Sequence, residues 1–323
     1  MIKLFKSLAK NFFKPMLHGN SYAEKTLLIN AQVISASNSE RSLINDLSDV
    51  EFQVFSQWGE DGIISWLIEK IKDIPRSYVE FGVEDYQEAN TRYLLQSRNW
   101  RGLVIDGSTD NVNRIRGQDL YWRHDLTAID AFIDRDNINT LISNSGFGGE
   151  IGLLSIDIDG NDYWVWQAID VISPIIVICE YNAVFGDYNA CTIPYQANFV
   201  RSNAHYSNLY FGASINAIIN LGKDKGYTFL GTNSAGCNAF FVRNDHASTF
   251  TTSVKRATMF PSLFREARNQ SGHLRYVSGI SRANIINDLP LVDIISGKIM
   301  PLSSLSALYS CEWSESMPRY VNL

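Results

Sequence analysis

The 323-residue sequence predicts an α/β fold whose mostly parallel sheet ends in an antiparallel hairpin. Two observations predict it. From Phe52 onward, apolar runs of strand length alternate with segments of helical period, which is typical of successive βα units. After the last unit, two short strand-like runs are joined by a turn-rich segment. The 45% share of hydrophobic residues fits a globular chain large enough for a substantial core.

The periodicities place the individual elements along the chain. Helices are expected over residues 60–72, 88–98, 128–138, 161–170 and 213–224. Strands are expected over residues 77–82, 102–106, 119–124, 151–157 and 175–180, and the hairpin over 227–231 and 238–242. Five βα units closed by a hairpin indicate the Rossmann-like sheet of a class I methyltransferase, because a dinucleotide-binding fold would more often continue with a sixth parallel strand.

Composition divides the chain into four regions. Residues 1–17 predict an N-terminal helix, 18–50 a linker with one short helix, 51–243 the methyltransferase-like domain, and 244–323 a C-terminal extension without a motif. Within the domain, residues 181–210 are rich in Asn and Tyr and show no period. A loop of that length in a compact domain is usually functional.

The N-terminal segment is basic and amphipathic. It carries Lys3, Lys6, Lys10 and Lys14 without an acidic residue, against the apolar stripe of Ile2, Phe5, Leu8, Phe12 and Met16. It lacks the unbroken apolar run and the cleavage site of a signal peptide. Two interpretations remain: the helix docks on the domain, or it lies on an anionic membrane surface. The second would place a cytoplasmic protein at the inner face of the membrane.

Charge and cysteine usage exclude several function classes. The net charge of −6 disfavours a nucleic-acid binder, so no nucleic-acid partner is expected. The four cysteines form no CxxC pair and no regular spacing, which indicates reduced thiols rather than a zinc site or a disulfide framework. No apolar run approaches the roughly 18 residues that a membrane-spanning helix requires.

Polar residues end every parallel strand of the predicted sheet. The strand ends are Glu80-Phe-Gly82, Asp106, His124-Asp125, Asp157-Ile-Asp159 and Glu180-Tyr-Asn182. Ligands of open α/β sheets bind at the carboxyl ends of the strands. One such carboxylate is commonly a helix N-cap. Five strands that all end this way predict a polar ligand site.

The first two strand ends suit a nucleoside that bears an amino acid. The carboxylate of Glu80 can face an ammonium group, and Gly82 lets the backbone approach a ligand closely. Asp106 follows the glycine turn by about 20 residues, which is the spacing of an acid that accepts hydrogen bonds from a ribose diol. For each acid the alternative is a helix cap or a solvated carboxylate.

Four motifs within residues 54–243 belong together, and they are Ser56-Gln-Trp-Gly-Glu-Asp-Gly62, Val79-Glu-Phe-Gly82 with Asn90-Thr91, Trp100-Arg-Gly-Leu-Val-Ile-Asp106 and Asn238-Ala-Phe-Phe-Val242. Through these motifs the chain resembles the FkbM-like methyltransferases, class I enzymes that depend on S-adenosylmethionine and often serve sugar or polysaccharide biosynthesis. The resemblance implies a cofactor site lined by Gln57, Glu80, Gly82, Asp106 and Asp125, with Asp125 near the adenine. The turn after the first strand departs from the family pattern because it holds a single glycine.

The fourth and fifth strand ends predict a metal site. Asp157, Asp159, Glu180 and Asn182 carry oxygen ligands at two neighbouring strands about 4.8 Å apart, which suits Mg²⁺ or Mn²⁺. The arrangement resembles the metal site of catechol and macrolide-sugar O-methyltransferases, where the metal lowers the pKa of the acceptor hydroxyl. Alternatively, Asp157 contacts the cofactor or caps the next helix, and Glu180 is a paired acid.

Two residues are candidates for catalysis, Asp157 at the metal site and His205 in the long loop. A histidine can act as the base that deprotonates a hydroxyl, although a lone loop histidine is more often solvated. The leading hypothesis is a metal-assisted O-methyltransferase whose acceptor is a sugar, nucleotide-linked or within a surface polysaccharide. The alternatives are a glycosyltransferase that uses Asp157-Ile-Asp159 as a DxD motif, and a noncatalytic module on the same fold.

Overall fold

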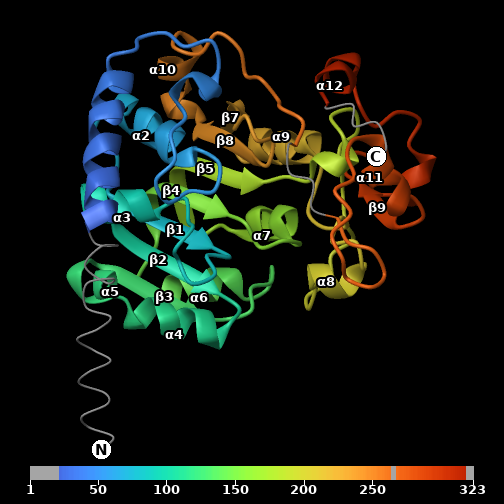
Figure 1. Ribbon diagram of the computed structural model, residues 1–323, viewed down its shortest axis with the longest axis horizontal. Helices are drawn as coiled ribbons and strands as arrows, with labels where there is room; N and C mark the ends of the chain where they lie inside the picture. Colours follow the sequence, from blue (N-terminus) through green and yellow to red (C-terminus); the bar gives the residue numbers. More distant parts are fainter. Residues whose placement is uncertain (1–21, 263–266, 318–323) are drawn as a thin grey trace, which may run out of the picture.

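The computed structural model describes residues 22–262 and 267–317 and contains a seven-stranded sheet (Figure 1). The strand order is β3-β2-β1-β4-β5-β8-β7. The strands are β1 (Ser77–Phe81), β2 (Arg101–Asp106), β3 (Leu126–Asp130), β4 (Gly149–Ile156), β5 (Ile172–Glu180), β7 (Tyr227–Thr232) and β8 (Asn238–Arg243). The first five are parallel, and β8 runs antiparallel to both β5 and β7. The class I methyltransferase sheet predicted from the sequence is therefore confirmed.

Helices cover both faces of the sheet. Successive strand side chains point to opposite faces, so Tyr78 packs in one core cluster and Val79 in the other. One face is covered by α2 (Glu60–Lys70), α3 (Arg92–Arg98), α4 (Thr109–Gly117) and α10 (Ala247–Thr251), and the other by α6 (Ile138–Asn144), α7 (Asp162–Ala168) and α9 (Ile215–Asp224). Because both faces are buried, the central strands are predominantly apolar, with Glu80 and Ser155 as buried exceptions.

The third strand lies later in the chain than expected. Residues predicted as a strand over 119–124 form helix α5 (Asp119–Arg123), and part of the predicted helix over 128–138 is the end of β3. Helix α5 buries only Leu120, whereas β3 buries Leu126 and Ala128 and pairs in parallel with β2. The prediction was wrong because β3 is a short edge strand with a weak apolar signal.

The region expected to be a linker is ordered structure. Residues 22–39 form a helix that packs Ala31 and Ser35 inward, and η1 (Leu47–Val50) follows. Ile44 forms an isolated parallel bridge with Val254. The basic helix predicted for residues 1–17 lies outside the described residues. Within the described ranges, no helix has the length and apolar character needed to cross a bilayer.

The C-terminal residues and the long loop build a second, smaller core. Strand β9 (Pro290–Asp293) pairs with β10 (Ile299–Pro301) and with β6 (Cys191–Thr192) from the loop. The other short elements are η2 (Ala183–Phe185), α8 (Arg201–Ala204), η3 (Asn244–His246), α11 (Ile280–Ile285), η4 (Leu302–Ser304) and α12 (Cys311–Ser316). This part lies beyond the carboxyl ends of β4 and β5 (Figure 1), where it can shape a ligand site.

Gly82 allows the ends of β1 and β4 to approach each other. Its φ is +68°, and a Cβ atom there would lie 1.6 Å from the backbone oxygen of Asp157. The sequence suggested that Gly82 lets the backbone approach a ligand. In the structure Gly82 lines the pocket described below and also admits the neighbouring strand end. Only glycine combines this backbone conformation with this close approach.

Glu80 fixes the connection between β1 and α3. Its carboxylate is buried and accepts hydrogen bonds from the backbone N–H of Asn90 (2.8 Å) and of Thr91 (3.1 Å), and from the Thr91 hydroxyl. Burial raises the pKa of Glu80 to about 7, although these hydrogen bonds lower it in part. Glu80 therefore holds the loop that lines the pocket described below.

Replacing Gly82→Ala is expected to destabilise the protein by about 3 kcal/mol or more, because the β1 and β4 ends must separate. The matched control is Gly117→Ala, since a Cβ at Gly117 meets no atom within 4 Å. The control should change stability by less than about 1 kcal/mol. Urea unfolding of both variants checks this, and equal stabilities would contradict the role given to Gly82.

The raised pKa of Glu80 predicts a pH-dependent stability difference. Between its ordinary value of 4.5 and about 7, the folded state keeps a proton that the unfolded state has lost. The free energy of unfolding therefore falls as pH rises through this window, by up to on the order of 3 kcal/mol. Glu80→Gln removes this contribution, so its stability relative to the wild type should improve from pH 5 to pH 8. If the difference in free energy of unfolding between Glu80→Gln and the wild type is the same at pH 5 and pH 8, the prediction is wrong.

Candidate functional site

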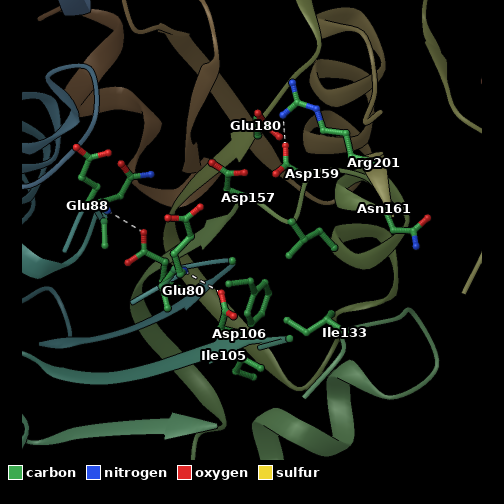
Figure 2. Close-up of a pocket in the computed structure, with 18 of the residues that line it drawn as sticks. Glu80, Glu88, Ile105, Asp106, Ile133, Asp157, Asp159, Asn161, Glu180 and Arg201 are labelled. Atoms are coloured by element: carbon green, nitrogen blue, oxygen red, sulfur yellow. Dashed lines mark hydrogen bonds and ion pairs between the residues drawn. The ribbon is translucent and has the colours of Figure 1, made fainter. Parts of the chain in front are cut away.

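A pocket of about 460 Å³ opens at the carboxyl ends of β1, β2, β4 and β5 (Figure 2). Its lining is predominantly acidic. The pocket is lined by seven acidic residues, which are Glu80, Glu84, Glu88, Asp106, Asp157, Asp159 and Glu180. Among the described lining residues, Arg201 is the one basic side chain. Such a site favours a cationic ligand, a metal ion, or both.

The segment before α2 contributes one wall through two buried acids. Asp61 Oδ2 accepts hydrogen bonds from the backbone N–H groups of residues 54, 55 and 56, at 2.7 to 2.9 Å. Glu60 accepts from the Trp58 N–H and from the side-chain amide of Asn238. These bonds fold the segment so that Gln57 and Trp58 line the pocket.

Asp106 ends β2 and faces the pocket. Its Oδ1 accepts from the Ser108 N–H (2.8 Å) and the side-chain amide of Asn111 (3.2 Å), which holds the start of α4, whose N-cap is Ser108. Its Oδ2 accepts from the Glu84 N–H at 2.8 Å. A carboxylate offers about four acceptor positions, so Asp106 keeps capacity for one further donor.

The pocket wall beside Asp106 is apolar. It consists of Ile105 and of Ala131, Phe132 and Ile133, which follow β3. Phe132 is 48% exposed, so its ring is accessible to a planar ligand. Sequence reasoning missed these residues because it placed the third strand too early; a strand over residues 126–130 would have pointed to them.

Asp125 lies at the opposite end of the sheet from the pocket. It precedes β3, is not among the pocket-lining residues, and interacts with Arg101 at 3.7 Å on the surface. Its expected place near the adenine depended on a strand that ended at His124-Asp125. The actual strand begins at Leu126, so Asp125 is at its amino end.

Three carboxyl groups gather where β4 and β5 end. Asp157, Asp162 and Glu180 each offer one oxygen within 4.8 Å of the others. Glu180 Oε2 is shielded from solvent and has no hydrogen-bond partner among the described residues. Asp162 also holds the loop after β4, since its oxygens accept from the N–H groups of Ile158 (2.8 Å) and Gly160 (2.9 Å).

The pKa values of this cluster reflect burial and mutual repulsion. Burial, followed by the negative charges of neighbouring carboxylates, raises the pKa of both Asp157 and Glu180 well above the ordinary range. Burial raises the pKa of Asp162 to about 6. The apposed acids therefore bind a proton or a cation readily.

The other two expected metal ligands do not join the cluster. The buried amide of Asn182 donates to the carbonyls of Leu209 and Phe211, both at 2.9 Å, and its Oδ1 accepts from the Val184 N–H. Asn182 therefore fixes the long loop. Asp159 forms an ion pair with Arg201 and lines the pocket outside the cluster.

The sequence analysis singled out His205 in the long loop, but the charged residue of this loop that lines the pocket is Arg201. His205 does not line the pocket, and its Nδ1 interacts with the Ser207 hydroxyl at 2.7 Å. Arg201 does line it, and its guanidinium stacks 4.0 Å from the Phe211 ring centroid. Sequence reasoning missed Arg201 because nothing in the irregular loop distinguished it.

No protein-family model matches the sequence, and no curated protein matches it. Solved structures that resemble the chain include a S-adenosylmethionine-dependent methyltransferase from Clostridium acetobutylicum ATCC 824, which is 12% identical with a TM-score of 0.36 and aligns over 57% of this chain and 90% of its own. The O-methyltransferase from Bacillus cereus in complex with SAH is 13% identical, with a TM-score of 0.37 over 67% of this chain and 89% of its own. The N-terminal domain of EvdMO1 with SAH bound is 8% identical, with a TM-score of 0.39 over 68% of this chain and 95% of its own. The assignment of the class I methyltransferase fold rests on the strand order of the sheet itself.

Proposed function

We propose that this chain is a S-adenosylmethionine-dependent O-methyltransferase that acts on a hydroxyl group of a sugar. The observation that carries the proposal is the position of Asp106 at the end of β2, beside an exposed aromatic ring and opposite an acidic cluster. In a sheet of this order, that arrangement suits a nucleoside on one side and an acceptor hydroxyl on the other. The FkbM-like resemblance of the motifs supports the sugar as acceptor.

The residues of the chain would bind and orient the reactants. S-adenosylmethionine would supply an electrophilic methyl group on a sulfonium sulfur. Asp106 would accept a ribose hydroxyl, and Phe132 would stack on the adenine. The acidic lining favours a cofactor with a net positive charge. Holding the acceptor oxygen in line with the methyl carbon would provide much of the rate acceleration.

The acidic cluster fits a divalent metal ion. Three carboxylate oxygens within 4.8 Å, one of them buried without a partner, form a hard-ligand set of the kind that Mg²⁺ and Mn²⁺ prefer. We propose Asp157, Glu180 and Asp162 as the ligands. A cation held there would supply Lewis acidity that lowers the pKa of the acceptor hydroxyl.

No observation favours the glycosyltransferase alternative. A DxD motif requires both carboxylates for a metal–diphosphate complex. Here Asp159 is paired with Arg201, while Asp157 faces Glu180 and Asp162. Calorimetric titration with S-adenosylhomocysteine and with a nucleotide sugar separates the two functions, because only a methyltransferase should bind the former.

The cofactor assignment predicts that Asp106→Asn weakens binding of S-adenosylhomocysteine at least about tenfold. The loss of one hydrogen bond to a charged group costs about 1.5–3 kcal/mol, and 1.4 kcal/mol corresponds to a factor of ten. Asp110→Asn is the matched control, because Asp110 is exposed on α4 and does not line the pocket. Isothermal calorimetry compares the dissociation constants. If the wild type shows no binding, the proposed function fails.

The metal assignment predicts that Mn²⁺ binds the wild type, and that Glu180→Gln reduces its affinity at least tenfold. Removing one charged ligand from three leaves a weaker and less complete set. Glu88→Gln serves as the control, since Glu88 lines the same pocket outside the cluster. Electron paramagnetic resonance of free Mn²⁺ measures the binding. Equal affinities in both variants would exclude the cluster as the site.

A further inference from the structure

Arg282 in helix α11 is a buried arginine that forms no ion pair with any acidic side chain of the described residues. Only 6% of its surface is exposed, and its Nε is shielded from solvent without a hydrogen-bond partner. The function proposed above does not use this residue.

The charged groups near Arg282 do not compensate its charge. Burial lowers the pKa of Arg282 to about 10, the Tyr309 phenol acts in the opposite direction, and the positive charge of Arg201 lowers the pKa further. Arg201 lines the pocket and is paired with Asp159. The two arginines belong to one region, because Ala204 of α8 and Ala283 of α11 pack in the same small core. The charged side chain that acts on Arg282 from the side of the pocket is therefore a second cation.

Burial of the Arg282 charge lowers the free energy of unfolding. A buried charge without a partner costs several kcal/mol, and apolar residues of similar volume commonly stabilise such positions. The surroundings would suit an apolar side chain, because Ala283 and Ile286 of the same region are buried in the smaller core. An anion that bound at Arg282 would remove the cost.

We propose that Arg282 and Arg201 form an anion subsite beside the pocket, which receives a phosphate or carboxylate group of the acceptor. The planar guanidinium offers paired donors that match both groups. Helices α8 and α11, which carry the two arginines, belong to the part of the molecule beyond the carboxyl ends of β4 and β5 (Figure 1). The description of the ligand as the acceptor rests on the proposed function, whereas anion binding does not.

The charge of the pocket also sets the orientation of such an acceptor. Seven acidic residues line it, and those that are ionised repel an anionic group, whereas Arg201 attracts it. The anionic end would therefore lie toward the two arginines, and an uncharged hydroxyl of the sugar would point to Asp157 and Glu180. The subsite selects phosphorylated, nucleotide-linked or uronic-acid sugars over neutral ones.

The test uses the full chain with three probes: inorganic pyrophosphate, UDP and glucuronate. Arg282→Met removes the charge and keeps an apolar side chain, whereas Arg256→Gln removes an exposed arginine as the control. Thermal unfolding and calorimetry are measured for each. The wild type and the control should be stabilised by at least one probe. Arg282→Met should have a higher midpoint without probe and at least tenfold weaker affinity.

The outcomes distinguish the ligands and the hypotheses. Binding of pyrophosphate or UDP alone assigns a phosphorylated acceptor, and binding of glucuronate alone assigns a carboxylate. Equal affinity of the wild type and Arg282→Met, or no binding of any probe to the wild type, overturns the subsite. Arg282→Lys keeps the charge without the planar donors and should bind with intermediate affinity. A separate titration with S-adenosylhomocysteine shows whether the proposed function fails independently.

Discussion

The mutual repulsion of carboxylates at one edge of the sheet is the constraint on which this structure depends. Parallel strands bring their carboxyl ends together, and here nearly every end is acidic. Buried carboxylates are costly unless hydrogen bonds or opposite charges compensate them. The hydrogen bonds and ion pairs that compensate these acids also fix the conformations of the loops around the pocket.

Several acids in and around the pocket are compensated by backbone N–H groups. Glu80 holds the segment before α3, Asp61 the segment before α2, and Asp162 the loop after β4. Asp159 is compensated by Arg201 instead. Asp157 and Glu180 remain with raised pKa values and little local compensation. This pair is therefore the part of the site where buried acids remain able to bind a proton or a cation.

The long loop and the C-terminal region add a positive side to an otherwise negative pocket. Arg201 comes from the loop, and the loop shares a core with the C-terminal residues through β6 and β9. The extension that showed no motif in the sequence therefore helps to position one wall of the site. Its buried Arg282 has an Nε without a hydrogen-bond partner among the described residues.

The sequence by itself determined the sheet and its strand ends. Alternation of apolar runs predicted the central strands, because their burial on both faces leaves a strong pattern, and it failed at the short edge strand β3. It also singled out Asp106, Asp157 and Glu180, since acids that follow buried strands must share one edge of a parallel sheet. Only the tertiary structure decided which acids are structural. Contacts between segments far apart in the chain give Asn182, Arg201 and Asp162 their roles. Such contacts cannot be predicted from local periodicity.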